Sequence, residues 1–225
     1  MTPIQEIYKT LKFVSDPKDL TEKQVQVLEP VLKQEIDVRQ ERRIEYLLNR
    51  SGLKPIKRLE DFDWKFNPKI MREEIMNVVQ ALTNNEIINV MLIGPAGVGK
   101  THLAKGIGYK AILQCIPVVF ITCHDLINRI KRSRNKAATI EYYAKAKILC
   151  IDEIGYVFPD PKEANDIFQI ISKRSEVAST IITTNLIPSQ WGKIFEAATS
   201  TAILDRLSHN GNFITWEGSS YRTTK

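Results

Sequence analysis

The segment GPAGVGKT constrains the fold and chemistry of this 225-residue chain more than any other feature. It matches the pattern G-x-x-x-x-G-K-[ST] at every fixed position, and it lies between a predicted buried strand, IINVMLI, and a predicted helix, THLAKGIGYKAI. Glycines at such a turn allow positive φ angles and close backbone approach, so that successive amides converge on phosphate oxygens at a helix N-terminus. The sequence therefore predicts a P-loop that holds the β- and γ-phosphates of a nucleotide.

Two side chains of this loop have distinct predicted roles. Lys100 would add a positive charge at the β- and γ-phosphate oxygens, and the hydroxyl of Thr101 would ligate Mg²⁺. We expect His102, in the first helical turn, to pack near the nucleotide, with ATP as the expected ligand. The predicted nucleotide-binding residues are Gly94, Pro95, Ala96, Gly97, Val98, Gly99, Lys100, Thr101 and His102.

From about residue 61 onward, apolar runs alternate with amphipathic stretches. Strands are expected at 87–93, 117–122, 148–152 and 180–184, and helices at 71–82, 99–114, 124–134, 138–146 and 163–175. Strands that alternate with helices indicate βαβ units and a parallel sheet, and near-continuous apolar strands indicate that both faces of the sheet are covered. Residues 61–225 are therefore predicted to form a three-layer α/β domain.

Residues 1–60 are polar, rich in charge and free of strand-like runs, which predicts a small helical N-terminal domain. The range 21–50 reads as one or two helices, with Thr21 and Gln24 at the spacing of a capping box. Pro30 is expected to kink or break this run, and Ser51-Gly52 to end it. The segment RQERRIEYLLNR carries four arginines, which fit either a solvated helix face or a DNA contact.

Two further strands end in polar residues. The strand ILCID leads into Asp152 and Glu153, about 50 residues after the P-loop. Asp152 is predicted to hold the Mg²⁺ shell, and Glu153 to act as the general base toward the attacking water. The strand TIITT is followed by Asn185, whose amide can orient that water, because the carboxyl ends of parallel strands face the ligand crevice. Acidic turn residues and a simple turn cap are the alternative readings.

These signals, in this order, resemble the AAA+ branch of P-loop ATPases. The match is closer to the IstB-type helper ATPases of bacterial insertion sequences, through GKTHLAKGIG, SQWGKIF, TAILDRL and the closing GSSYR, and FDW at 62–64 resembles the family's entry into its ATPase domain. The resemblance spans about residues 1–222. It implies an ATP-dependent, DNA-binding homo-oligomer that assists a transposase. DnaC-type helicase loaders share the fold and the closing SYR, so a helicase loader is the alternative.

The resemblance also implies an arginine finger, a guanidinium from a neighbouring subunit that stabilises charge in the transition state. Arg206, in AILDRL, matches the position where this branch carries its finger. Arg174, at the end of the helix before TIITT, is the second candidate. A surface arginine in a salt bridge is the alternative for each.

A basic segment, HDLINRIKRSRNK, follows the strand PVVFIT. The spacing of Arg129, Arg132 and Lys136 predicts that they share one helix face, which would suit a phosphate backbone, and the resemblance places DNA-facing elements here. No base-reading motif is present, so double-stranded DNA would be bound largely without sequence preference. A solvated helix face is the alternative. The predicted DNA-binding residues are Arg129, Lys131, Arg132, Arg134 and Lys136.

Composition indicates which partners, metal sites and cellular location to expect. The net charge of +6 favours polyanionic partners without requiring them. The three cysteines lie in apolar runs and form no CxxC pair, which indicates buried, reduced thiols and no zinc site. The absence of a long apolar run and of a signal-peptide pattern predicts a cytoplasmic protein with no membrane partner. A DNA-binding module with a purely structural nucleotide is disfavoured by the complete set of Lys100, Thr101, Asp152 and Glu153.

Overall fold

The computed structural model describes residues 3–67, 69–218 and 220–221, and the chain divides into two compact units, Met1–Tyr46 and Leu47–Lys225. The sequence placed this boundary at residue 60. The boundary differs because Leu53 and Leu59 belong to the larger unit, where both side chains are buried and lie against Gly108 and Gly106 of helix α4 (Lys100–Leu113). No helix in the described ranges combines the length and apolar character needed to cross a membrane.

The N-terminal unit is helical, as expected. It contains α1 (Pro3–Leu11), a 3-10 turn (Pro17–Asp19) and most of α2 (Glu22–Ser51). The predicted capping box at the start of α2 is present, since Thr21 N donates to Gln24 Oε1 at 2.8 Å and Gln24 N to Thr21 Oγ1 at 3.4 Å. The sequence predicted a kink or a break at Pro30, and no break occurs. The helix runs through the proline, which removes only one backbone donor from a run of 30 residues.

The larger unit is an α/β domain. A 3-10 turn (Leu59–Asp61) leads into its elements, which are α3 (Arg72–Thr83), β1 (Asn89–Ile93), α4, β2 (Val118–Thr122), α5 (Cys123–Arg132), α6 (Lys136–Ala144), β3 (Ile148–Ile154), α7 (Pro161–Arg174), β4 (Ser179–Thr184), a 3-10 turn (Pro188–Lys193), α8 (Ala197–Ser208) and β5 (Gly211–Thr215). The four predicted strands and five predicted helices of this unit are confirmed, with small shifts at their ends. Helix α8 and strand β5 of this unit, and α1 of the N-terminal unit, were not predicted from the sequence.

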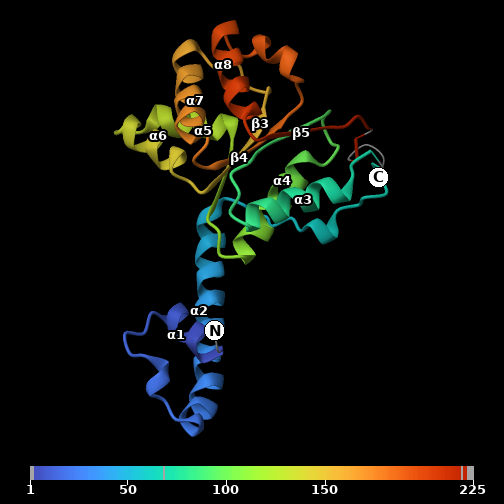
Figure 1. Ribbon diagram of the computed structural model, residues 1–225. Coiled ribbons are helices and arrows are strands. Elements are labelled where there is room, and N and C mark those ends of the chain that lie inside the picture. The colour runs from blue at the N-terminus through green and yellow to red at the C-terminus, as the bar shows by residue number, and fades with distance from the viewer. Residues whose placement is uncertain (1–2, 68, 219, 222–225) are drawn as a thin grey trace. The chain divides into compact units, whose positions relative to one another are not determined.

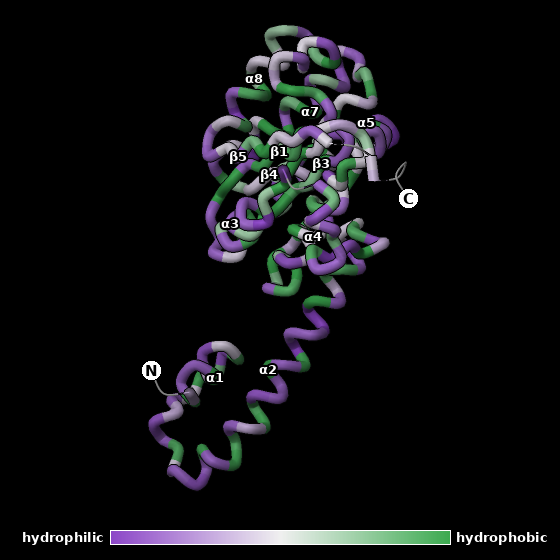
Figure 2. The backbone as a smooth tube through the Cα atoms, turned by 90° about the vertical axis from the view of Figure 1, so that its right-hand side faces the viewer, coloured by the Kyte–Doolittle hydropathy of each residue, from purple (hydrophilic) through white to green (hydrophobic). Residues whose placement is uncertain are grey.

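All strands of the sheet are parallel, in the order β2-β3-β4-β1-β5. Helices α3 and α4 lie on one side of the sheet, and α5, α7 and α8 on the other, with α6 packed on α5 and α7 (Figure 1). The central strands are largely hydrophobic (Figure 2), and the buried faces of α5, α7 and α8 pack against them. Every residue of β1 and β4 is buried, which is the pattern of strands covered on both faces.

The cysteines take no part in this core beyond packing. Cys123 and Cys150 are buried, Cys115 is half-buried, and all three are free thiols. Burial raises the pKa of Cys123 to about 12 and also raises the pKa of Cys150, so both thiols stay protonated and unreactive.

Candidate active site

The P-loop follows β1 and opens α4, as predicted. Its first amide, Gly94 N, donates to Thr184 O at 3.1 Å, which anchors the loop to the end of β4. Gly97 and Gly99 have φ angles of +80° and +100°. A Cβ atom at Gly99 would lie 2.5 Å from the Phe62 ring, and one at Gly97 would lie 2.1 Å from Ser220 Oγ. Glycine is therefore required at both positions by backbone conformation and by close neighbours.

Lys100 is the first residue of α4, and its side chain folds back over the loop. The ammonium group donates to Gly94 O and to Pro95 O, both at 2.7 Å, and the residue is buried. The cationic nitrogen is thus held inside the curve of the loop, where amides and the helix N-terminus also favour an anion. This arrangement fits phosphate binding.

Thr101 and Asp152 meet at the same edge of the sheet. Thr101 Oγ1 lies 3.0 Å from each carboxylate oxygen of Asp152, which is buried near the end of β3. A hydroxyl and a carboxylate are the oxygen donors that Mg²⁺ uses when phosphates and water supply its remaining ligands. Within the described residues no cluster of three or more His, Cys, Asp or Glu side chains could hold a metal unaided. The pair therefore fits a metal that arrives with a nucleotide.

Glu153 lies next to Asp152 but in a different environment. Its side chain is exposed whereas Asp152 and Ile154 are buried, and its φ of +63° is unusual for a residue with a side chain. The β3–β4 register shifts between Ile151 and Ile154, so Glu153 sits in a bulge. Bulges beside active sites re-aim side chains, and this one leaves a carboxylate accessible to solvent at the nucleotide edge.

Asn185 follows β4 at this same edge. Its Oδ1 lies 2.6 Å from the position that a Cβ atom on Gly155 would occupy, which places the amide against the turn after Glu153. That oxygen is buried and has no hydrogen-bond partner in the described part of the chain. The structure thus brings Lys100, Thr101, Asp152, Glu153 and Asn185 to one edge, while their individual roles remain predictions.

The C-terminal stretch lies beside the P-loop, which the sequence reading did not anticipate. Trp216 N donates to Ile93 O and Tyr221 N donates to Gly97 O, both at 3.1 Å. The Tyr221 ring packs edge-on against Phe66 at 4.9 Å between centroids. The motif GSSYR was the only sequence signal for this contact, and its Ser219 and Arg222 lie outside the described residues.

An aromatic cluster lies beside Gly99 of the loop. Phe62 lies 4.8 Å from Trp64 and 5.2 Å from His102, measured between ring centroids. His102 Nε2 donates to Arg58 O at 2.7 Å, which fixes the imidazole beside the loop as a packing group. Phe62 and His102 therefore lie beside the P-loop, and the packing of His102 near a nucleotide stays a prediction.

Arg206 lies far from the P-loop of its own chain. Its carbonyl accepts a hydrogen bond from Asn89 Nδ2 at 3.2 Å, and Asn89 is at the opposite end of β1 from the P-loop. That strand alone separates them by roughly 13 Å, at about 3.3 Å per residue. The guanidinium bonds to Ser172 Oγ at 2.7 Å and borders a groove of about 540 Å³ that also contains Glu176 and His209. Arg206 could thus meet a nucleotide only if that nucleotide belongs to another subunit.

Arg174, the second candidate for the arginine finger, is buried inside its own subunit and is therefore not available to a neighbouring subunit. Its side chain is 1% exposed. The guanidinium donates to four carbonyl oxygens, those of Ser179, Tyr143 (2.8 Å), Ala144 (3.0 Å) and Ala146 (2.6 Å). It also donates to Thr180 Oγ1 at 3.1 Å. Burial lowers the pKa of this guanidinium to about 9, and the five acceptors favour its cationic form. Arg174 therefore ties the end of α6 to α7 and β4.

Replacing the two arginines should lower the stability of the protein by different amounts. Arg174→Ala should lower the free energy of unfolding by about 3 kcal/mol or more, because it leaves several buried carbonyls without a donor. Arg206→Ala, at a half-buried site, should cost about 1 kcal/mol or less. Denaturant unfolding of both variants measures the difference. Equal stabilities would contradict the structural role of Arg174.

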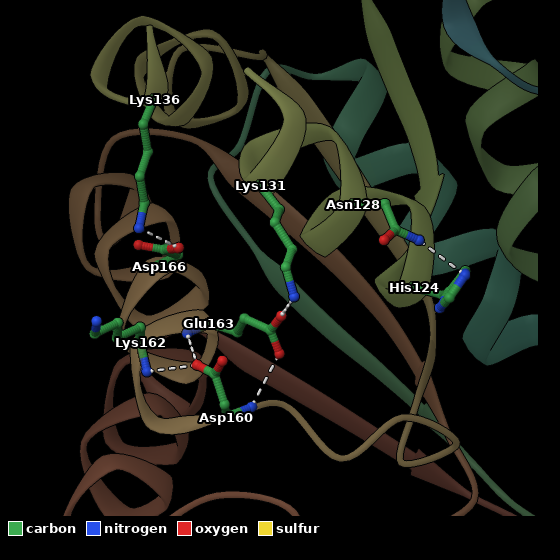
Figure 3. Close-up of polar contacts among 8 residues, drawn as sticks. All are labelled: His124, Asn128, Lys131, Lys136, Asp160, Lys162, Glu163 and Asp166. Carbon is green, nitrogen blue, oxygen red and sulfur yellow. Dashed lines mark hydrogen bonds and ion pairs between the residues drawn. The ribbon is translucent and has the colours of Figure 1, made fainter. Parts of the chain in front are cut away.

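The basic segment differs from its sequence prediction. Helix α5 ends at Arg132 and α6 begins at Lys136, so Arg129, Arg132 and Lys136 do not share one helix face. Lys131 pairs with Glu163 at 3.1 Å, and Lys136 with the buried Asp166 at 2.8 Å, and both carboxylates belong to α7 (Figure 3). These two lysines therefore hold α5 and α6 on α7.

The arginines of this segment are placed differently from the lysines. Arg129, Arg132 and Arg134 are exposed, and the first two line a groove of about 970 Å³ between α5 and α6. Arg129 also donates to the Tyr143 hydroxyl at 3.4 Å. The candidate polyanion surface is thus narrower than the sequence suggested and is formed by arginines.

Residues 10–225 match the protein family described as "IstB-like ATP binding protein". The chain belongs to this family. It is 36% identical over 202 residues to a protein of Bacillus thuringiensis subsp. berliner named as ATP-binding in insertion sequence IS232, with 88% of this chain and 81% of the relative covered. It is 35% identical over 195 residues to the corresponding IS21 protein of Pseudomonas aeruginosa, with 85% and 74% covered. Membership of the IstB-like family confirms the resemblance read from the sequence motifs.

Solved structures confirm the AAA+ P-loop fold of this IstB-like chain. A crystal structure of DnaI aligns with a TM-score of 0.61 at 18% identity and covers 74% of this chain and 92% of DnaI. The DnaC helicase loader aligns with a TM-score of 0.55 at 18% identity, over 77% and 99% of the two chains. At this identity the likeness concerns the fold alone.

Proposed function

We propose that this chain is an ATP-hydrolysing helper protein of an insertion sequence, which assembles as a homo-oligomer on duplex DNA and recruits or regulates a transposase. The observation that most supports hydrolysis is the convergence of Lys100, Thr101, Asp152, Glu153 and Asn185 at one edge of the sheet. Relatives named as ATP-binding proteins of insertion sequences support the transposition context.

In this proposal each residue has one task. Lys100 binds the β- and γ-phosphates, and Thr101 and Asp152 hold Mg²⁺, which when bound neutralises charge on the phosphates. Glu153 accepts a proton from the attacking water, and Asn185 orients that water. Arg206 of one subunit completes the site of its neighbour. Its distance from its own P-loop and its position on a groove support this role.

DNA binding in this proposal depends on Arg129 and Arg132 of α5 and on Arg134 in the connection to α6. Arg129 and Arg132 line the groove, Arg134 is close to it in sequence, and the chain has a net charge of +6. These features suit contacts to phosphates, which carry no sequence information. A related fold, the replication initiator DnaA, has been solved with single-stranded DNA, so duplex and single strands need separate tests.

A helicase loader is the second candidate, because DnaC and DnaI share the fold. The transposition role is favoured because insertion-sequence relatives are 35–36% identical over most of the chain, whereas these loaders are 18% identical. Pull-down with the transposase of the same element and with the host helicase separates the two. Binding to the helicase alone would favour the loader.

The proposal is tested by ATP hydrolysis at several protein concentrations, with and without duplex DNA. Turnover per subunit should rise with protein concentration, because each site needs a neighbour, and DNA should increase it by aligning subunits. A rate per subunit that is independent of both would contradict an oligomer acting on DNA.

The DNA surface gives a second prediction. Replacing Arg129 and Arg132 with glutamine should reduce the slope of log affinity against log salt by about 1.8, or about 0.9 for each lost phosphate contact, equally on unrelated duplexes. Lys131→Gln is the matched control, since it removes a neighbouring charge that is already paired with Glu163. Its slope should stay near that of the parent protein. A double variant with an unaltered slope would assign Arg129 and Arg132 to a solvated face.

A further inference from the structure

Thr183 has a buried hydroxyl in direct contact with both acidic residues of the site. It is the fifth residue of β4 and is 0% exposed. Its Oγ1 bonds to Asp152 Oδ1, and it accepts a hydrogen bond from Glu153 N at 2.9 Å. A hydroxyl carries one proton, and the Glu153 amide is already a donor. The Thr183 proton must therefore point to the Asp152 carboxylate, which is a charge-assisted bond.

The position of Thr183 in the sheet explains why a side chain is needed there. Ile151 pairs with Ile182 and Ile154 pairs with Thr184, so Thr183 alone faces both Asp152 and Glu153 across the bulge. The bulge interrupts the backbone ladder, and the Glu153 amide bonds to the Thr183 hydroxyl in place of a strand carbonyl. The positive φ of Glu153 is a sparsely populated conformation that persists only where its surroundings fix it.

Asp152 depends on the same hydroxyl for its orientation. The carboxylate is buried, and among the described residues it bonds to the side chains of Thr101 and Thr183. Thr101 is itself a predicted metal ligand, so it cannot also serve as the fixed support of Asp152. Thr183 can serve as this support, because it is not a predicted metal ligand and it contacts the carboxylate from within the sheet.

We propose that Thr183 is a positioning residue for this site. Its one hydroxyl orients the Asp152 carboxylate toward the metal and holds the backbone that presents Glu153 to water. The inference rests on the proposed ATP hydrolysis for its effect on turnover, but its effect on metal-dependent nucleotide binding does not require hydrolysis. Groups that orient metal ligands in this way are commonly worth 10–100-fold in metal affinity or activity.

The test removes the hydroxyl and keeps the volume. Thr183→Val should bind a fluorescent, non-hydrolysable ATP analogue in EDTA as the parent protein does, because Lys100 and the loop amides are intact. The Mg²⁺ concentration that gives half-maximal tightening of the analogue should rise about 10–100-fold, and kcat should fall by a similar factor with little change in KM for ATP. Thr183→Ser keeps the hydroxyl and should restore both quantities.

Thr180→Val is the matched control, since it removes an equally buried hydroxyl from the same strand, one that contacts Arg174 instead of the acidic pair. Its Mg²⁺ requirement should equal that of the parent. If Thr183→Val does not fold, Thr183→Ala provides the same deletion. An Mg²⁺ requirement and kcat within twofold of the parent in a folded variant would overturn the inference. If the parent protein hydrolyses no ATP, the proposed hydrolysis fails, while the Mg²⁺ titration still decides the role of Thr183.

Discussion

Replacing Glu153 with glutamine is expected to lower the turnover number for ATP by about 10²–10⁴-fold, which is the usual contribution of a general base. The amide has nearly the same shape as the carboxylate but cannot accept the proton from water. Lys100, Thr101 and Asp152 are untouched, so the affinity for ATP should stay close to that of the parent. Steady-state hydrolysis and equilibrium binding of the same preparation measure both quantities.

Two control variants separate the loss of a general base from weaker nucleotide binding and from the loss of any carboxylate. Lys100→Ala should weaken nucleotide binding itself, because it removes the ammonium held over the loop at Gly94 and Pro95. Glu141→Gln changes an exposed carboxylate that pairs with Lys145 and Lys173, and it should leave turnover unchanged. Unchanged turnover in Glu153→Gln would remove Glu153 from the role of base.

Arg206→Ala is expected to bind ATP normally and to hydrolyse it about 10³-fold more slowly or worse, if the finger is complete. Arg206→Lys should recover little of the loss, because an ammonium group cannot make the paired hydrogen bonds of a guanidinium. The free energy of unfolding should change little in either variant. Substantial hydrolysis by Arg206→Ala, measured at saturating ATP and protein, would exclude Arg206 as the finger.

The central sheet and its nucleotide edge were predictable from the sequence. The P-loop fixes a strand and a helix by itself, and the apolar strands ILCID and TIITT bring Asp152, Glu153 and Asn185 to the same edge, because parallel strands end together. Strand β5 was missed because it is a short edge strand with a half-exposed pattern. Helix α8 was missed because Thr199, Ser200 and Thr201, which have low helix propensity, lie in its first turns.

Side-chain partners were the part that the sequence could not supply. Arg174, Lys131 and Lys136 all looked like available cations, but their partners are carbonyls and carboxylates far along the chain. Thr183 looked like an ordinary strand residue, because its contact with Asp152 depends on the register of two strands. Such roles depend on tertiary pairing, which local spacing does not determine.

The proposed function depends on ATP being hydrolysed at a site shared by two subunits, and a mixture of two inactive proteins tests this most directly. Arg206→Ala retains an intact P-loop, and Lys100→Ala retains an intact Arg206. When the two are combined on duplex DNA, some interfaces pair the intact P-loop of one variant with the intact Arg206 of the other. Hydrolysis should then return to a substantial fraction of the parent rate. A mixture that stays inactive, although both variants still assemble on DNA, would contradict a site completed by Arg206 of the neighbouring subunit.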